Sequence, residues 1–163
     1  MANKNNAKFG KAKQEENPVQ ISSTVSPDGS AISLLFDFLS TNSGRLPGKD
    51  NRISTKSVSF KIPLTDNSKD IHIKTDIRGF VRTPEGTKAT LFMHLCGKTT
   101  VINWPNSKSA NESVDETVIH TLPKGKEYLG TLFLLTERDS ENTDEALLAI
   151  DSLDITVVDQ KTK

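Results

Sequence analysis

Apolar and polar side chains alternate most regularly in the stretch Asp70-Ile71-His72-Ile73-Lys74-Thr75-Asp76-Ile77-Arg78-Gly79-Phe80-Val81. From residue 71 on, its odd-numbered positions are apolar or small, and its even-numbered positions carry charged residues, a histidine and a phenylalanine. A period of two is typical of a strand with one buried face. The stretch therefore predicts a long strand over 71–81 whose apolar face covers the core.

The composition narrows the class of protein. The chain has 163 residues, enough for one domain with a sizeable core, of which 34% are apolar and 26% charged. Its 21 basic side chains balance 21 acidic ones, so no global field favours nucleic acid or an anionic membrane, and we expect no nucleic-acid partner. The single cysteine excludes an intramolecular disulfide and a multi-cysteine zinc site.

The two ends of the chain are polar. The first residues do not begin a secretory signal, and no run of about 18 apolar residues predicts a membrane span, so we expect a cytoplasmic location, with a secreted one as the alternative. Residues 1–17, in which Phe9 is the one aromatic residue, predict a disordered arm whose lysines are solvated or contact an acidic partner. We expect a single β-sandwich domain over 18–158 and a frayed end over 159–163.

Three strands are predicted before the opening stretch, each bounded by turn or proline residues. They cover 19–23, 32–39 and 58–62, and a polar loop over 41–52 separates the last two. In the second strand, the residues expected on one face are Ile32, Leu34, Phe36 and Phe38, with Leu35 and Leu39 on the other. Apolar residues on both faces predict a central strand.

The turn Thr83-Pro84-Glu85-Gly86 makes a hairpin of 71–81 and 88–96 the expected pairing. An exposed loop is expected over 105–116. The other strands are expected over 100–104, 118–122, 128–135, 145–150 and 153–157, with a bulge near Ser152. For 145–150 we favour a strand over a helix, because its helical spacing lasts one turn and alternation follows directly.

These eight or nine strands, without a convincing helix, predict an all-β fold. Regularly spaced short strands with glycine or proline turns are typical of a sandwich or a barrel. The apolar residues on both faces of 32–39 and 128–135 favour an antiparallel β-sandwich of two sheets. Such a sheet has one face free for solvent or a ligand.

Four parts of the chain are similar to those of a known family. They are Val25-Ser26-Pro27-Asp28-Gly29-Ser30 with Phe36-Asp37-Phe38-Leu39, Val58-Ser59-Phe60-Lys61-Ile62-Pro63, Asp76-Ile77-Arg78-Gly79-Phe80, and Leu134-Leu135-Thr136-Glu137-Arg138 with Ile150-Asp151-Ser152. The chain resembles, over roughly residues 19 to 157, the bacterial secreted proteins called domain of unknown function 4360. The resemblance implies a β fold and supplies no activity. That family carries several cysteines, one of them where this chain has Ser54-Thr55.

The polar face of the opening stretch is the first candidate binding surface. Its residues are His72, Lys74, Asp76, Arg78 and Phe80. A polar stripe that ends in an aromatic residue fits a sugar or an acidic group. Alternatively, the residues form a cross-strand ladder of ion pairs, with Gly79 at a bulge or a close backbone approach. Trp104, next to Pro105, either stacks on a sugar or anchors a partner, or it packs at one end of the sandwich.

The spacing of the reactive residues gives little support to metal binding or catalysis. A metal site near His72, His94 and Cys96 requires that the strands of residues 72 and 94 pair, and His120 lies on a third strand. The pair of His94 and Cys96 is the one candidate for nucleophilic catalysis, although a free cysteine in an apolar strand is more often a buried hydrophobe. The sequence has no nucleophile elbow, glycine-rich phosphate loop or His-Glu-x-x-His motif. We therefore expect no catalytic residue, metal or cofactor.

Three functional hypotheses follow. The leading one is a non-catalytic module that binds a carbohydrate or protein ligand through the polar face of 72–80 and the loops 41–52 and 104–116. The second is a structural subunit that self-assembles as a homo-oligomer through sheet edges or apolar faces. The third is a hydrolase whose carboxylates, or His94 and Cys96, meet in a concave pocket.

Overall fold

The structure, a computed structural model, describes residues 7–14, 19–46, 49–50, 52–105, 111–139 and 145–158. These residues form strands and turns, and none of them belongs to a helix that could cross a membrane. The strands are β1 (Lys8–Phe9), β2 (Lys13–Gln14), β3 (Gln20–Val25), β4 (Ala31–Asp37), β5 (Ser40–Ser43), β6 (Arg45–Leu46), β7 (Lys49–Asp50), β8 (Ile53–Ile62), β9 (Leu64–Thr65), β10 (Ile71–Arg82), β11 (Thr87–Leu95), β12 (Lys98–Trp104), β13 (Asn111–Leu122), β14 (Tyr128–Arg138) and β15 (Ala146–Val158).

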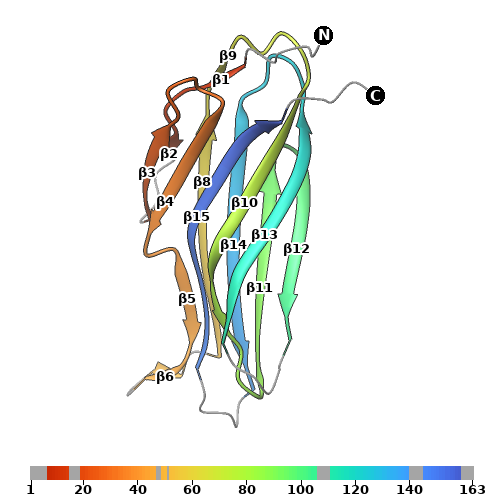
Figure 1. Cartoon of the computed structure of the whole chain (residues 1–163). Helices are drawn as coiled ribbons and strands as arrows, with labels where there is room; N and C mark the ends of the chain where they lie inside the picture. Colours follow the sequence, from red (N-terminus) through yellow and green to blue (C-terminus); the bar gives the residue numbers. More distant parts are fainter. Residues whose placement is uncertain are drawn as a thin grey trace.

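Two antiparallel sheets pack face to face. The first sheet has the order β13-β10-β15-β4-β3, with β5 also paired to β15, and the second sheet has the order β12-β11-β14-β8-β2. Figure 1 shows β15, β10 and β13 of the first sheet in front of β14, β11 and β12 of the second. The predicted all-β antiparallel sandwich is confirmed, as is the strand preferred over a helix for 145–150, which belongs to β15 from Ala146 on.

The apolar face of β10 lies in the core, as the opening stretch predicts. Ile71, Ile73, Ile77 and Val81 are all buried. Because alternate residues of a strand point to the same side, the neighbouring strands extend this layer, and the second sheet closes it from the opposite side. The largest buried side chains of the second sheet are Phe60, Ile62, Leu91, Met93, Leu95, Leu132, Leu134 and Tyr128.

β10 is an interior strand, paired with β13 on one side and β15 on the other. Its register to β15 shifts between Arg78 and Gly79, where Asp151 is the additional residue of β15. A β-carbon built on Gly79 would collide with the carbonyl oxygen of Ala149. The bulge predicted near Ser152 and the close approach predicted at Gly79 are confirmed, and both belong to this one feature.

The hairpin predicted between 71–81 and 88–96 is wrong. β10 and β11 belong to different sheets, so the turn between them carries the chain from the first sheet to the second. Within that turn Thr83 and Pro84 are buried, and the carbonyl oxygen of Gly86 accepts a hydrogen bond from the amide of Asp139 (2.8 Å). Turn residues determine where a chain reverses but not which strand it pairs with next, and a connection between sheets uses the same residues.

β11 forms its hairpin with β12 instead. Cys96 and Gly97 connect the two strands, and both have positive φ angles, 50° and 82°. Two successive left-handed residues are typical of the type I′ turn that joins strands by a two-residue loop. The short strand predicted over 100–104 is therefore confirmed, and it begins earlier, at Lys98.

An interruption between β4 and β5 changes which side chains of this edge are buried. The two strands lie end to end beside β15, and the register to β15 differs by two residues between them. Phe38 lies at the interruption with a left-handed backbone (φ 62°) and is 88% exposed, whereas Leu39 is buried. The faces predicted for Phe38 and Leu39 are therefore wrong, because strict alternation does not continue across an irregular edge.

Two predicted loops contain strands. The loop predicted over 41–52 holds β5 and the short pair β6 and β7, and the loop predicted over 105–116 ends where β13 begins at Asn111. Positions 47–48, 51 and 106–110 lie outside the described residues. β13 is an outermost strand of its sheet, and such strands can carry polar residues and still pair with their neighbour. The start of a polar edge strand therefore cannot be recognised from its composition.

The disordered arm predicted over 1–17 contacts the sandwich where the structure describes it. β1 pairs with β9, β2 pairs with β8, and Phe9 is buried in the core. A single aromatic residue thus holds a segment that its polar composition identifies as solvated. Positions 1–6 and 15–18, like the frayed end predicted over 159–163, lie outside the described residues.

Candidate functional site

The predicted polar row lies on the outer face of the first sheet. Its five members are His72, Lys74, Asp76, Arg78 and Phe80. The ammonium of Lys74 lies 3.2 Å from Asp76 Oδ2, and the hydroxyl of Thr117 donates to Asp76 Oδ1 at 2.6 Å. The Thr117 hydrogen bond, assisted by the Lys74 charge, lowers the pKa of Asp76 below its usual value.

The neighbours of this row bind one another rather than a free space. Asp76 lies opposite Asp154 of β15, and the hydroxyl of Ser33 donates to Asp154 (2.6 Å). The ring of His72 is 3.2 Å from the Thr121 hydroxyl on β13. The cross-strand contacts named here are hydrogen bonds, and the ion pair of Lys74 with Asp76 lies within β10, so the row differs from the cross-strand ladder of ion pairs that the sequence offers as the alternative to a binding surface.

Trp104 does not join the polar row. It ends β12 at the edge of the second sheet, opposite Ala89 of β11, and its half-buried side chain packs against the core. The structure therefore places Trp104 as the packing residue of the two sequence-based alternatives.

The three histidines and the cysteine lie in separate places. His72 is on the outer face of the first sheet, His94 is on the outer face of the second sheet, and His120 is buried between them. Among the residues that the structure describes, no group of three or more histidine, cysteine, aspartate or glutamate side chains is arranged to hold a metal ion. A metal site built from His72 and His94 fails because their strands belong to different sheets.

The candidate nucleophile is held in its unreactive form. Burial raises the pKa of the Cys96 thiol to about 11, and the ring nitrogen Nδ1 of His94 lies 2.8 Å from the Thr99 hydroxyl. Because the thiolate is the nucleophile, a thiol with this pKa is protonated at neutral pH. This geometry does not support covalent catalysis by the pair.

The outer face of the second sheet carries a feature that the sequence analysis does not single out. Val101, Phe92 and Phe133 are direct cross-strand neighbours on β12, β11 and β14, and we call them the aromatic platform. They are 46%, 36% and 37% exposed. The two phenylalanine rings meet edge to face, with centroids 5.8 Å apart and planes 67° from parallel.

Polar rows lie on both sides of the aromatic platform. On one side are Asn103, Thr90, Leu135 and Thr55, and on the other are Thr99, His94, Thr131 and Ser59. Their side chains bond within each row. Thr90 donates to Asn103 Oδ1 (3.0 Å), and the hydroxyls of Thr131 and Ser59 are 3.0 Å apart. The platform is therefore an apolar stripe about 7 Å from two rows that are polar except at Leu135, the half-buried neighbour of Phe133.

The three rows contain no carboxylate, ammonium or guanidinium group. Ser57 completes the middle row, which brings the three rows to twelve residues on four strands. Charged residues make up 26% of the chain, so an uncharged area of this size on a sheet face is unusual for its composition.

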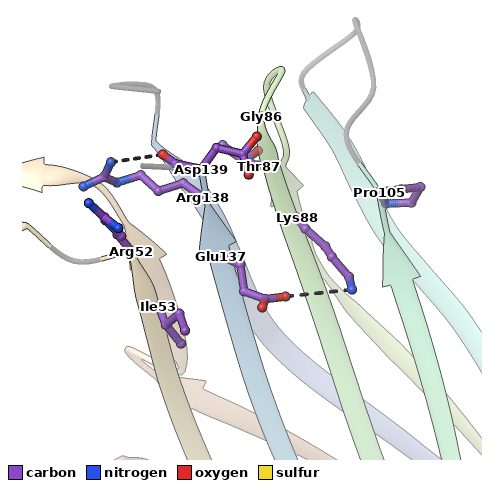
Figure 2. Close-up of a pocket in the computed structure, with 9 residues that line it drawn as sticks. All are labelled: Arg52, Ile53, Gly86, Thr87, Lys88, Pro105, Glu137, Arg138 and Asp139. Atoms are coloured by element: carbon purple, nitrogen blue, oxygen red, sulfur yellow. Dashed lines mark hydrogen bonds and ion pairs between the residues drawn. The ribbon is translucent and has the colours of Figure 1, made fainter. Parts of the chain in front are cut away.

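A charged pocket ends the uncharged area. It has a volume of about 620 Å³ and lies one row beyond Thr90 and Leu135, where Lys88 and Glu137 point toward one another with 3.9 Å between Nζ and Oε2. Figure 2 shows this pair, with Ile53 and Pro105 at the sides and the guanidinium of Arg138 beside Asp139. Cationic and anionic groups are mixed in the pocket, so it does not select one sign of charge.

The signal that could have identified the platform is present in the sequence. The apolar residues on both faces of 128–135 favour a two-sheet sandwich in the sequence analysis, and the mostly apolar stretch 89–96 also places Phe92 opposite its buried face. Only one face of each strand meets the first sheet, so the second apolar set has to be exposed or covered by another element. Phe92 and Phe133 are that second set.

His120 is a buried titratable group in the interior between the sheets. Its Nε2 lies 3.4 Å from the hydroxyl of Thr75, which in turn lies 3.0 Å from the hydroxyl of Tyr128, and its Nδ1 is buried without a hydrogen-bond partner. Burial lowers the pKa of His120, a hydrogen bond with the Leu95 backbone opposes this change, and the ammonium of Lys98 acts in the same direction as burial. The neutral imidazole is therefore the form that the fold stabilises.

We expect the free energy of unfolding to decrease as the pH falls below about 6.5, the pKa of an unperturbed histidine. Since the folded-state pKa of His120 is lower than the unfolded one, the unfolded chain binds more protons in this range, and the contribution of His120 is complete only above it. Urea denaturation between pH 7.5 and about 5 measures the slope. The slope should become shallower in His120→Gln. An equal slope in the two proteins contradicts the assignment.

Comparisons with known proteins identify no family for this chain. No protein-family model and no curated protein matches the sequence. Among solved structures, the chain is similar to "CBM35 from Cellvibrio japonicus Abf62", with 14% identity over 82% of this chain and 100% of the other and a TM-score of 0.37. It is also similar to CBM35 from Paenibacillus barcinonensis, with 14% identity over 93% of this chain and 100% of the other and a TM-score of 0.31. A third similar structure is the bacteriophage CBA120 tailspike protein 4, with 8% identity over 94% of this chain and 19% of the other and a TM-score of 0.36. At these identities and TM-scores the likeness carries no argument about the fold or the function of this chain.

Proposed function

We propose that the chain is a non-catalytic binding module whose ligand is an uncharged glycan, bound on the aromatic platform of the second sheet. The observation that carries the proposal is the apolar row of Val101, Phe92 and Phe133 on an exposed face, between two rows in which all side chains but Leu135 can form hydrogen bonds. A sugar ring has the complementary distribution, with apolar C–H groups on its faces and hydroxyl groups around its edge. The negative face of a phenylalanine ring attracts such C–H groups.

The width of the apolar area favours a sugar over a protein partner. Stable protein interfaces bury a broad apolar centre, and each partner contributes about 800 Å². The apolar area of the platform is narrower than such a centre: it is one side chain wide at Val101 and Phe92 and widens only at Phe133, toward Leu135. The polar row of His72 to Phe80 offers one aromatic side chain, that of Phe80.

Two sequence-based expectations remain predictions beside this proposal. One is the similarity to domain of unknown function 4360, and the other is the cellular location.

Self-assembly is also an alternative use of the same face. An oligomer that forms through the platform would dissociate in Phe133→Ala, which sedimentation at two protein concentrations would detect.

Affinity electrophoresis tests the proposal directly. The full chain is run through gels that contain xylan, glucomannan, laminarin or soluble starch, with alginate and polygalacturonate as charged comparators. We expect at least one uncharged polysaccharide to retard the protein and the charged ones to have no effect, because the three rows carry no charged group. Retardation by the charged polymers alone, or by none of the six, contradicts the proposal.

A further inference from the structure

The aromatic platform runs across the strands rather than along them. Its three members belong to three adjacent strands, and neighbouring strands are about 4.8 Å apart, so the platform offers successive contact points at roughly that interval. The measured separation of the two ring centroids is 5.8 Å. This interval is comparable to the length of one sugar unit in an extended chain, so each member can contact a different ring of the same glycan.

The row also has a defined length. Beyond Phe133 the next position is Ser57 on β8, which has no apolar side chain, and beyond Val101 the sheet ends, because β12 is its outermost strand. The apolar contacts therefore number three, and a glycan longer than about three rings gains no further ring contact on this face.

The angle between the two phenylalanine rings distinguishes one glycan chain from a flat surface. Rings that bind a crystalline polysaccharide must be coplanar, because all the sugar faces of such a surface lie in one plane. Here the ring planes differ by 67°, so Phe92 and Phe133 cannot both lie flat on the same plane. They can contact a single chain whose neighbouring sugar faces are not coplanar, which requires a chain free of the crystal lattice.

From these three observations we infer that the platform binds one soluble, uncharged glycan chain laid across β12, β11 and β14, with about three consecutive sugar rings on Val101, Phe92 and Phe133. The inference rests on the proposed function and specifies its ligand. The rows on either side, with the exposed Asn103 and Thr99 and the half-buried Thr131 and Ser59, lie beside the chain and face its hydroxyl groups. Charge complementarity agrees, since none of the three rows offers a charge to an acidic or basic polymer.

Calorimetric titration with xylo-, cello-, manno- and laminari-oligosaccharides of one to six sugars tests the inference, together with pull-down on crystalline cellulose and chitin. We expect the affinity for the recognised series to increase about tenfold from the disaccharide to the trisaccharide and to level off beyond it. The crystalline polymers should not retain the protein.

A matched pair of variants identifies the third contact. Val101→Ser removes a β-branched side chain from the exposed face of the edge strand β12, and Ile119→Ser removes one from the exposed face of the edge strand β13 in the other sheet. We expect the gain from disaccharide to trisaccharide to fall below about twofold in Val101→Ser and to remain in Ile119→Ser.

The outcomes separate the inference from the proposed function. Retention on crystalline cellulose that is lost in Phe133→Ala, or a monosaccharide that binds as tightly as the trisaccharide, overturns the inference and leaves the glycan-binding function in place. An unchanged length dependence in Val101→Ser also overturns it. No binding to any of the oligosaccharides or polymers overturns both.

Discussion

Phe133→Ala is expected to weaken glycan binding about thirtyfold or more while the fold remains intact, because truncation of an aromatic anchor typically costs about 2 kcal/mol or more of binding free energy. Phe133 is the last apolar member of the aromatic platform, next to Phe92 and followed by Ser57, and its loss removes both a sugar contact and the support of the Phe92 ring. Its exposed position means that truncation leaves no cavity in the core.

Phe80→Ala is the matched control for this result. Phe80 and Phe133 are both 37% exposed, both lie on the outer face of an interior strand, and they differ in the sheet to which they belong. We expect Phe80→Ala to retain full affinity in the same titration, with thermal denaturation as the check that both variants are folded. Loss of binding in Phe80→Ala with retention in Phe133→Ala would assign the site to the polar row on β10.

Gly79→Ala is expected to destabilise the protein by about 3 kcal/mol or more, at the upper end of the range for single substitutions. A β-carbon at this position meets the backbone of β15, with the carbonyl oxygen of Ala149 in collision and the Cα of Ile150 at 3.0 Å. Neither atom belongs to a side chain that can rotate away, so β10 and β15 must separate at the bulge. Because both are interior strands of the first sheet, the separation disturbs the core beneath them.

The neighbouring substitution Arg78→Ala is the control for Gly79→Ala. Arg78 precedes the glycine on the same strand, and its side chain is exposed on the outer face. We expect its free energy of unfolding in urea to stay within about 0.5 kcal/mol of the parent, as is usual for surface substitutions. A Gly79→Ala protein as stable as Arg78→Ala would show that the two strands do not approach as closely as the structure indicates.

Part of the fold follows from alternation alone. The buried face of Ile71 to Val81 is confirmed because burial of alternate residues is decided within one strand and needs no knowledge of its partners. The bulge at Asp151 is confirmed for the same reason, since a local change of phase in the sequence reports an inserted residue. The pairing of β10 could not be derived in this way, because pairing depends on strands distant in the sequence, namely β13 and β15.

The candidate site was likewise predictable from the sequence only within one strand, and not across strands. The residues His72, Lys74, Asp76, Arg78 and Phe80 share one face, as their spacing predicts, but their spacing does not reveal that Thr117 and Thr121 on the adjacent strand bind two of them. The aromatic platform depends entirely on cross-strand register. Phe92 and Phe133 are far apart in the sequence, and only the pairing of β11 with β14 makes them neighbours.

By itself, the sequence determined that this chain is an antiparallel β-sandwich, where most of its strands lie, and which face of each regular strand is apolar, because these properties depend on a local period of two and on turn chemistry. Only the tertiary structure decided which strands are neighbours, that the turn at Thr83 to Gly86 connects two sheets, and which apolar face remains uncovered. The physical reason is that a strand with two apolar faces can bury one against the opposite sheet, and whether anything covers the other is a property of the whole assembly of strands. In this protein the uncovered face is that of Phe92 and Phe133.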